Sequence, residues 1–515
     1  MKQISPVSRA EQASRFFRRA MLLLFAALCM AALFSILLYV IVHGLEQGSW
    51  ELRFPAALAA ALPAALLLYA AARRPSKSGR LSPLPLAALL AALSALCLLW
   101  ELWCVRALPL EPIGDYRVFF RAASDLASGL PLRDSRYLAL FPHILGYANF
   151  LMLFFRLTGS TGVAPVINAL LTCGTGLLLF LLGYRSRGWK HGAAAFLIWI
   201  LCPSKTLYNS MVLSEPLYTN LLLLFLLLLS ELERREGGLK HPVLIGVPAG
   251  VLLGVLARAI QAVRPIAPIL LIALALWLLL LRLPKLRERR SRSLWLPLML
   301  VLAVVYLLSG KLWDRVLLRE LGEEPAHSVG YSLYTGLNVE GSGTHDESYT
   351  DLLNEYRDRP GATAQSAQED MLRALKVRLR AEKIPYLRFL AEKLKVFLGS
   401  DEAAARYASD ASGGRDLELA AFLSNVWFYA LLLAAALAAV NRGSATRAGV
   451  PLLAPLFVLG LSLAHMLIEV AGRYHYSILP MLILTALCLV RAPSGDAEAG
   501  SFSVSARPNP KESGA

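Results

Sequence analysis

The chain alternates between long apolar runs and short polar segments. Most of the runs approach the roughly 20 apolar residues that a helix needs to cross about 30 Å of hydrocarbon. The pattern therefore predicts an all-α, polytopic integral membrane protein with about twelve transmembrane helices. We expect these helices at residues 20–42, 55–72, 84–104, 162–184, 191–203, 213–230, 243–258, 266–282, 295–312, 418–440, 449–468 and 475–490.

Arg and Lys gather in the short segments that flank alternate spans. The basic segments are 15–19, 73–80, 185–190, 234–240, 282–292, 442–447 and Arg491. Cytoplasmic loops of membrane proteins carry such an excess of positive charge. We therefore expect these segments and both termini to lie in the cytoplasm, with the other loops outside the cell membrane. Topology also accounts for the net charge of +16, so no nucleic-acid partner is expected.

One apolar stretch, 137–157, is left out of the predicted spans. Counting it would place the basic segment 185–190 and the acidic candidate residues on the wrong sides of the membrane. The stretch also contains proline, histidine, glycine and asparagine, which suit a lipid-facing helix poorly. We expect it to be juxtamembrane or re-entrant, within a first large external loop of juxtamembrane helices at 105–161.

The spans divide the chain into five parts. They are a cytoplasmic N-terminus (1–19), a transmembrane catalytic module (20–312), an extracytoplasmic loop (313–417), C-terminal transmembrane helices (418–492) and a disordered cytoplasmic tail (493–515). The extracytoplasmic loop is too long for a connector. Its stretch at about 365–395 mixes apolar and basic residues, which predicts a helix along the membrane surface.

Composition narrows the classes of function. With 57% hydrophobic and 17% charged residues, the chain does not read as a soluble protein. Its six cysteines lie in or beside apolar runs without a CxxC motif, so we expect packing roles and neither disulfides nor a metal site. The chain has no P-loop, HExxH or GxSxG motif and no soluble part large enough for a nucleotide-sugar fold. A substrate must therefore arrive activated and already in the membrane, as a polyprenyl phosphate ester does.

Two acidic residues outside the apolar runs are candidates for catalysis. Asp115 lies about ten residues after the predicted span 84–104, where a carboxylate at the membrane surface can accept the proton of an acceptor hydroxyl. The simpler interpretation is a helix cap, because helical sequence follows. Glu215 precedes Pro216 at the start of a long apolar helix, where an acid also suits the helix dipole. Both interpretations stay open for each residue.

Arg473, Arg264 and Lys205 are the candidates for binding a phosphate. Arg473 opens the last span, four residues after Glu469, with which it would pair at helical spacing. A guanidinium at the membrane surface also binds phosphate through two hydrogen bonds. Lone cations at helix ends frequently extend to lipid headgroups instead, so the sequence leaves the choice open.

The histidines give no metal-binding pattern. His143 and His475 have no partner at metal-ligand spacing, which favours hydrogen-bonded structural roles. Mg²⁺ or Mn²⁺ is often held by one or two carboxylates together with substrate oxygens. Asp115 with Glu215 or His143 would supply such a set, and the sequence leaves a divalent cation open as a cofactor.

The order of these features resembles a known family. The motifs are Asp115-Tyr116 after an early span, Phe141-Pro142-His143, Gly146-Tyr147, Ser214-Glu215-Pro216-Leu217-Tyr218, Val263-Arg264-Pro265 and, opening the last span, Glu469 followed by Gly472-Arg473-Tyr474. Over roughly 84–310 and 418–490 the chain resembles the C-type (GT-C) superfamily of integral-membrane glycosyltransferases. It is most similar to the bacterial dolichyl-phosphate-mannose-protein mannosyltransferase-like (family 39-like) group, which includes the lipid A aminoarabinose transferases.

The resemblance implies roles for individual residues. Asp115 would be the general base or a metal ligand, Glu215 the acid that opens a later span, and Arg473 a ligand of the donor phosphate. Residues expected to contact substrate are Tyr116, His143, Tyr474 and, in the long external loop, Asn338. Two departures from the family pattern matter. Tyr116 stands where relatives often have a second acid, and the family's His-Pro-Pro segment appears as Phe-Pro-His.

The predicted function is an inverting glycosyltransferase at the extracytoplasmic face of the cell membrane. Its donor would be a polyprenyl-phosphate sugar, and its acceptor a hydroxyl of a protein, polysaccharide, teichoic acid or lipid of the cell envelope. Two alternatives from other classes are a transporter or flippase for a lipid-linked glycan and a non-catalytic protein that binds the polyprenyl carrier. A transporter would depend on ionisable residues at mid-membrane depth, and the sequence has almost none there.

Overall fold

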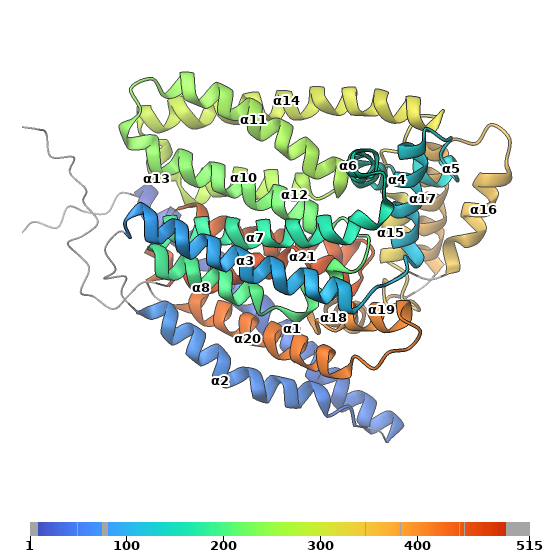
Figure 1. Ribbon diagram of the computed structural model, residues 1–515, viewed down its shortest axis with the longest axis horizontal. Coiled ribbons are helices and arrows are strands. Elements are labelled where there is room, and N and C mark those ends of the chain that lie inside the picture. Colours follow the sequence, from blue (N-terminus) through green and yellow to red (C-terminus); the bar gives the residue numbers. More distant parts are fainter. Residues whose placement is uncertain are drawn as a thin grey trace, which may run out of the picture.

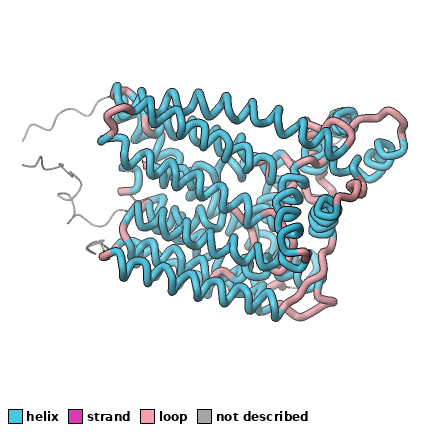
Figure 2. Tube along the Cα trace, turned by 45° about the horizontal axis from the view of Figure 1, so that its top comes forward, coloured by secondary structure: helices cyan, strands magenta, loops and turns pink. Residues whose placement is uncertain are grey.

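The computed structural model describes residues 9–48, 50–74, 81–345, 347–381, 383–441, 443–446 and 449–490. This part of the chain is helical and contains no β-strand, which confirms the predicted all-α class. Long helices run side by side in one direction, and short helices gather at one end of the bundle (Figure 1). Figure 2 shows the same division from a second direction. The tail predicted to be disordered, 493–515, lies outside the described residues.

Nine helices among the described residues are long and apolar enough to cross a membrane. They are α1 (Arg9–Gln47), α2 (Arg53–Arg73), α3 (Pro83–Ala107), α7 (Ala164–Arg187), α10 (Glu215–Arg235), α11 (Pro242–Val263), α14 (Arg289–Leu321), α20 (Glu418–Val440) and α21 (Leu453–Leu467), some extended by a flanking helical turn.

The predicted count of twelve spans is not confirmed. The other three apolar runs form the shorter helices α8 (Trp189–Ile200), α12 (Ala267–Leu276, continued by a π-helical turn to Leu281) and α22 (Ile478–Cys488). Helices of this size rise only about 16–22 Å, which is short of the ~30 Å hydrocarbon layer. The side chains of α22 are buried throughout, so this helix is packed within the bundle.

The short helices define what we call the site end. They are α4 (Gly114–Ser128), α5 (Ser135–Leu140), α6 (His143–Thr158), α15 (Gly330–Gly336), α16 (Thr350–Asp358), α17 (Ala364–Ala381), α18 (Tyr386–Leu398) and α19 (Ala403–Ala411). The short helix α9 (Pro203–Asn209) also belongs to this end, where it packs against α19, whereas α13 (Leu283–Leu286) lies at the other end of the bundle, beside the start of α14 (Figure 1). The single helix expected at 365–395 is two helices, because Pro385 lacks the N–H that a continuous helix requires.

The stretch 137–157 forms α5 and α6, and α6 lies across the bundle. Figure 1 shows α6 end-on, while the long helices beside it are seen from the side. It packs against α4 and the end of α11. The approach to α11 is close because a Cβ atom on Gly146 would stand 2.0 Å from the carbonyl oxygen of Ala262. Glycine at this position therefore lets α6 and α11 approach closely. The approach brings together His143, the first residue of α6, and Arg264, which directly follows α11.

Helices α11 and α14 pack through a row of small residues. Gly246, Gly250 and Gly254 repeat every fourth residue along α11 and face the backbone of α14. A Cβ atom on Gly250 would stand 2.6 Å from the carbonyl oxygen of Leu298. Small residues at this spacing let membrane helices approach closely enough for backbone packing. The contact fixes the direction of α11, whose last turn leads to Arg264.

The opposite end, which we call the basic end, holds the described basic segments together. Ion pairs join Arg185 to Glu231 and Arg282 to Glu236, and Arg19 donates to the carbonyl oxygen of Val440 at 3.2 Å. Arg187 donates to backbone carbonyls that end α2 and follow α22. The segments predicted to share the cytoplasmic side therefore lie at one end of the bundle.

The long loop is folded onto the site end. α14 continues to Leu321, so the polar segment begins later than the predicted boundary at 313. α15 packs against α17 and α21, and α18 packs against α1 and α21. α20 packs along α1 and α2, so the helices before and after the loop form one bundle. The described helices of the predicted parts 20–312 and 418–492 thus pack together in one bundle.

Candidate active site

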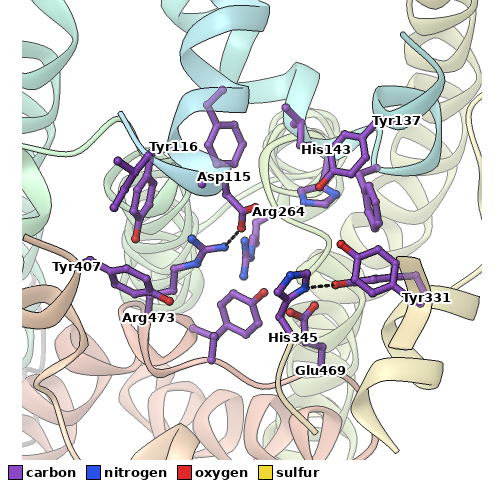
Figure 3. A pocket seen from close by; sticks show the side chains of 18 of the residues that line it. Asp115, Tyr116, Tyr137, His143, Arg264, Tyr331, His345, Tyr407, Glu469 and Arg473 are labelled. Atoms are coloured by element: carbon purple, nitrogen blue, oxygen red, sulfur yellow. Dashed lines mark hydrogen bonds and ion pairs between the residues drawn. The ribbon is translucent and has the colours of Figure 1, made fainter. Parts of the chain in front are cut away.

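A cavity of about 410 Å³ opens at the site end, and residues from six separate segments line it (Figure 3). α4, α5, α6 and the end of α11 supply its first half, and the long loop and the segment after α21 supply the other. Its lining residues are Ile113, Gly114, Asp115, Tyr116, Phe119, Tyr137, Phe141, His143, Ile144, Arg264, Tyr331, His345, Tyr349, Tyr407, Asp410, Glu469, Ala471, Arg473 and Tyr474.

Asp115 lies in the first turn of α4 and faces the cavity. The helix begins at Gly114, whose φ of +50° belongs to the region that glycine adopts without strain. The Asp115 side chain is 53% exposed, and its Oδ2 accepts a hydrogen bond from Nη2 of Arg473. One carboxylate oxygen therefore faces a guanidinium while the side chain remains open to the cavity.

Arg473 joins three segments through its buried guanidinium. It lies in the 3₁₀ turn Gly472–His475, and its side chain is only 9% exposed. Its Nε is 3.9 Å from Oε1 of Glu215, which is almost fully buried at the start of α10. Its guanidinium carbon also lies 5.3 Å from the ring centre of Tyr116 and 5.5 Å from that of Tyr474. The two carboxylates and two rings hold the cation in place.

The electrostatics keep this pair ionised. Burial raises the pKa of Asp115, but the charge and hydrogen bond of Arg473 lower it by more, and Arg264 adds to the lowering. The resulting pKa lies below the usual value for an aspartic acid. Burial lowers the pKa of Arg473, but Tyr116, Tyr474, Asp115 and Glu215 raise it well above its usual range. At neutral pH the carboxylate is therefore available as a base.

Arg264 brings a second cation to the cavity. It follows the last turn of α11, and its guanidinium carbon lies 4.3 Å from the ring centre of Tyr474. Among the described residues it forms no ion pair with a carboxylate, whereas Arg473 is paired. Two guanidiniums thus converge beside one aspartate, and one of them is open to an anionic ligand.

His143 also lines the cavity, as a neutral imidazole. Burial, together with the nearby positive charges of Arg264 and Arg473, lowers its pKa to about 3 against the opposing effect of Asp115. A neutral ring both donates and accepts hydrogen bonds. Such a ring can pair with a polar ligand without adding charge, so the predicted role of His143 in binding substrate stays a prediction.

Lys205 and Asn338 do not line the cavity. Lys205 is fully buried and paired with Glu101, a carboxylate that also accepts hydrogen bonds from Thr206 at 3.1 Å and Asn209 at 2.8 Å. Breaking a buried ion pair costs about 3–5 kcal/mol, so this lysine is committed to the helix packing. Asn338 is a buried turn residue whose carbonyl oxygen accepts a hydrogen bond from the N–H of Gly343 at 2.9 Å.

Glu469 and His345 are cavity residues that sequence reasoning did not assign to the site. The predicted helical pairing of Glu469 with Arg473 is absent from the described contacts, because α21 ends at Leu467 and residues 468–471 are not helical. Burial raises the pKa of Glu469, against the lowering by Arg473. Nδ1 of His345 lies 3.2 Å from the hydroxyl of Tyr331. Nothing in the local sequence around His345 marked it as a site residue.

The donor atoms do not form a metal site. The described residues contain no group of three or more His, Cys, Asp or Glu side chains placed to hold an ion. Asp115, the predicted metal ligand, already faces the guanidinium of Arg473, with which a cation would have to compete. The described side chains do not by themselves assemble a divalent-cation site, so no catalytic step is assigned to one.

An apolar groove of about 670 Å³ begins beside the cavity. Its walls come from α6, α10, α11 and α14, all of which carry apolar side chains here. Gly146 and Val263 line the groove, and their near neighbours His143 and Arg264 line the cavity. Leu312 and Val255 in its wall are more than half exposed, so the groove opens sideways from the bundle.

Comparison with known proteins adds no identification, since no protein-family model matches the chain and no curated protein matches it significantly. The assignment of a function therefore depends on the residues of the cavity and the groove.

Proposed function

We propose that this protein is an inverting glycosyltransferase that moves a sugar from a polyprenyl-phosphate donor to a hydroxyl group. The observation that supports it most directly is the ionised Asp115 between two guanidiniums, those of Arg473 and Arg264. A base beside a phosphate-binding pair is the arrangement that transfer from a sugar phosphate requires.

The proposed step uses these three side chains. The acceptor hydroxyl gives its proton to a carboxylate oxygen of Asp115 while its oxygen forms a bond to the anomeric carbon of the donor sugar. The bond from that carbon to the phosphate oxygen breaks, and the bonding electrons leave with the polyprenyl phosphate. Arg264 and Arg473 stabilise the added negative charge on the departing phosphate. Glu215 keeps Arg473 oriented from behind.

The apolar groove supports a lipid-linked donor. A polyprenyl chain is a long hydrocarbon, and moving it from water to an apolar surface lowers its free energy. The groove is lined mainly by apolar side chains, with Asn149, Arg258 and Ser309 as its polar members, and it begins next to Arg264. Three of its four walls, α10, α11 and α14, are long enough to span a membrane. A lipid carrier lying in it would present its phosphate to the cavity.

The charge distribution supports an extracytoplasmic site. Arg185, Arg187, Arg234, Arg282 and Arg290 lie at the basic end, opposite the cavity. The positive-inside rule assigns that end to the cytoplasm of the cell membrane. The cavity would then face outward, where acceptors of the cell envelope are found.

The test is release of polyprenyl phosphate by the purified protein in lipid nanodiscs. Undecaprenyl-phosphate sugars carrying hexose, pentose or amino sugar would be offered with envelope fractions as acceptor. We expect Asp115→Asn to lower the rate of release by about 10²- to 10⁴-fold, because the amide cannot take a proton. Binding of the carrier should change little.

A matched control is Asp134→Asn in the same loop, an exposed aspartate paired with Arg357. It should release carrier at the rate of the unmodified protein. Release that persists in Asp115→Asn would contradict the assigned base. Carrier binding without release from any donor would instead favour the binding-only alternative.

A further inference from the structure

The cavity has two chemically different sides that meet at Asp115. Arg473, Tyr116 and Tyr407 lie on one side of it, and Tyr331, His345 and Glu469 on the other (Figure 3). Arg473 lies on the first side, Arg264 lies in the middle beside Asp115, and the second side contains no lysine or arginine (Figure 3). In the proposed transfer the phosphate binds these two arginines, so the second side serves the other reactant.

The second side is built on a continuous chain of aromatic rings, which we call the aromatic wall. It consists of Tyr137, Phe141, Tyr331 and Tyr349, all lining the cavity. Successive ring centres are 4.8, 4.7 and 4.9 Å apart. Neighbouring rings meet at an angle, which is the favourable arrangement for aromatic pairs. The rings therefore form a rigid apolar surface that requires little ordering when a ligand binds.

Two polar side chains stand beside this wall. The carboxyl group of Glu469 and the imidazole of His345 both line the cavity, and Nδ1 of His345 lies 3.2 Å from the hydroxyl of Tyr331. The Glu469 backbone N–H donates to the carbonyl oxygen of Ser332 at 2.8 Å, which holds its segment against α15. A ligand on the wall would thus find fixed hydrogen-bonding groups at one edge.

We propose that the aromatic wall, with Glu469 and His345, is the acceptor subsite and that it binds a neutral sugar ring at the end of a glycan. The proposal rests on the transfer reaction proposed above. In an inverting displacement the nucleophile enters opposite the leaving group. Since the phosphate lies on the side of the arginines, the acceptor hydroxyl reaches Asp115 from the side of the wall.

The chemistry of the wall selects among the acceptor classes. A sugar ring has an apolar face of C–H groups that packs on aromatic rings, and hydroxyls at its edge that pair with a carboxyl group and an imidazole. A phosphate-rich acceptor, such as teichoic acid or a phosphorylated lipid, would bring negative charge to Glu469. An extended peptide needs partners for its backbone groups, and this wall consists of side chains.

Binding measured without transfer tests the subsite separately from the reaction. Methyl glycosides of common hexoses and pentoses would be titrated onto the nanodisc-embedded protein with undecaprenyl phosphate bound, with saturation-transfer NMR as readout. A serine- and threonine-containing peptide, a glycerol-phosphate oligomer and a phosphorylated glucosamine disaccharide serve as the competing probes. We expect methyl glycosides to bind and the other three probes to fail.

The variants distinguish the two sides of the cavity. Tyr137→Leu and Glu469→Gln should each weaken glycoside binding by roughly tenfold, while the affinity for undecaprenyl phosphate stays unchanged. Tyr137→Phe keeps the ring and should lose much less. Arg473→Gln should do the reverse, with weaker carrier binding and unchanged glycoside binding.

The subsite would be overturned if no glycoside binds, or if a peptide or phosphorylated probe binds instead. It would also be overturned if Tyr137→Leu and Glu469→Gln both bind glycoside normally, or if Arg473→Gln alone abolishes glycoside binding. Glycoside binding with the expected variant pattern, but with no release of undecaprenyl phosphate from any donor, would support the subsite and reject the transferase.

Discussion

At the scale of single residues, the reactivity of Asp115 depends on a partner far away in the chain. Burial at the cavity would by itself raise the pKa of this carboxyl group, and Arg473 reverses the effect. A catalytic base needs to be ionised at working pH. The ion pair therefore favours the ionised form of Asp115 and holds one of its carboxylate oxygens in place.

The acid limb of the pH–rate profile should report this dependence. In the unmodified protein we expect it below the ordinary pKa of an aspartic acid, about 3.9. In Arg473→Gln the charge that lowers the pKa of Asp115 is removed, while the burial that raises this pKa remains. The acid limb of the residual activity should therefore move to higher pH. The measurement is release of polyprenyl phosphate at saturating donor between about pH 3.5 and 8.

The control for this shift is Arg121→Gln, which removes an exposed arginine of the same helix, α4, outside the cavity lining. Its acid limb should coincide with that of the unmodified protein. An unshifted limb in Arg473→Gln would mean that another group controls the rate.

At the scale of elements, α18 secures the loop that builds the aromatic wall. Nζ of Lys393, fully buried, donates to the carbonyl oxygens of Gly336 and, at 2.8 Å, of Ile468. The Val470 N–H donates to the carbonyl oxygen of Gly343 at 2.8 Å across the same junction. One side chain from α18 thus joins the end of α15 to the segment that carries Glu469.

The Lys393 contact should make folding stability depend on pH. Burial lowers the pKa of Lys393 to about 7, against a smaller raising effect of Glu469. In the unfolded chain a lysine has a pKa of about 10.4. Between these values the unfolded state binds more protons, so this group makes stability rise with pH. The neutral amine keeps two N–H groups, enough for both carbonyl oxygens.

We therefore expect the difference in thermal unfolding midpoint between the unmodified protein and Lys393→Met to grow from pH 7 to pH 9.5. At the higher pH the variant should be the less stable, because two carbonyl oxygens lose their donor, at about 1–3 kcal/mol for each buried group left unpaired. Parallel curves for the two proteins would show that the buried amine does not titrate in this range.

At the scale of the whole molecule, one end carries the cavity and the other the basic segments. The bundle keeps them apart because the helices between them are long and apolar. Membrane orientation therefore determines the side of the membrane to which the cavity opens.

Cysteine labelling tests this orientation. In a Cys104→Ser background, whose other native cysteines are buried, single cysteines would replace exposed Leu130 and Asp358 at the site end and Gly237 at the basic end. We expect an impermeant maleimide to label the first two in intact cells and Gly237→Cys only after permeabilisation. Labelling of Leu130→Cys and Asp358→Cys on opposite faces would reject a common outward cavity.

The sequence by itself determined the all-α class, the repeated membrane-crossing helices and the shared end for Asp115, Arg264 and Arg473, because hydropathy and loop charge act locally. It also marked Asp115 and Arg473 through neighbouring motifs. Only the tertiary structure decided that Lys205 is paired with Glu101 and that Glu469 and His345 face the cavity. Those outcomes depend on contacts between segments a hundred or more residues apart, and no local pattern in the sequence specifies such contacts.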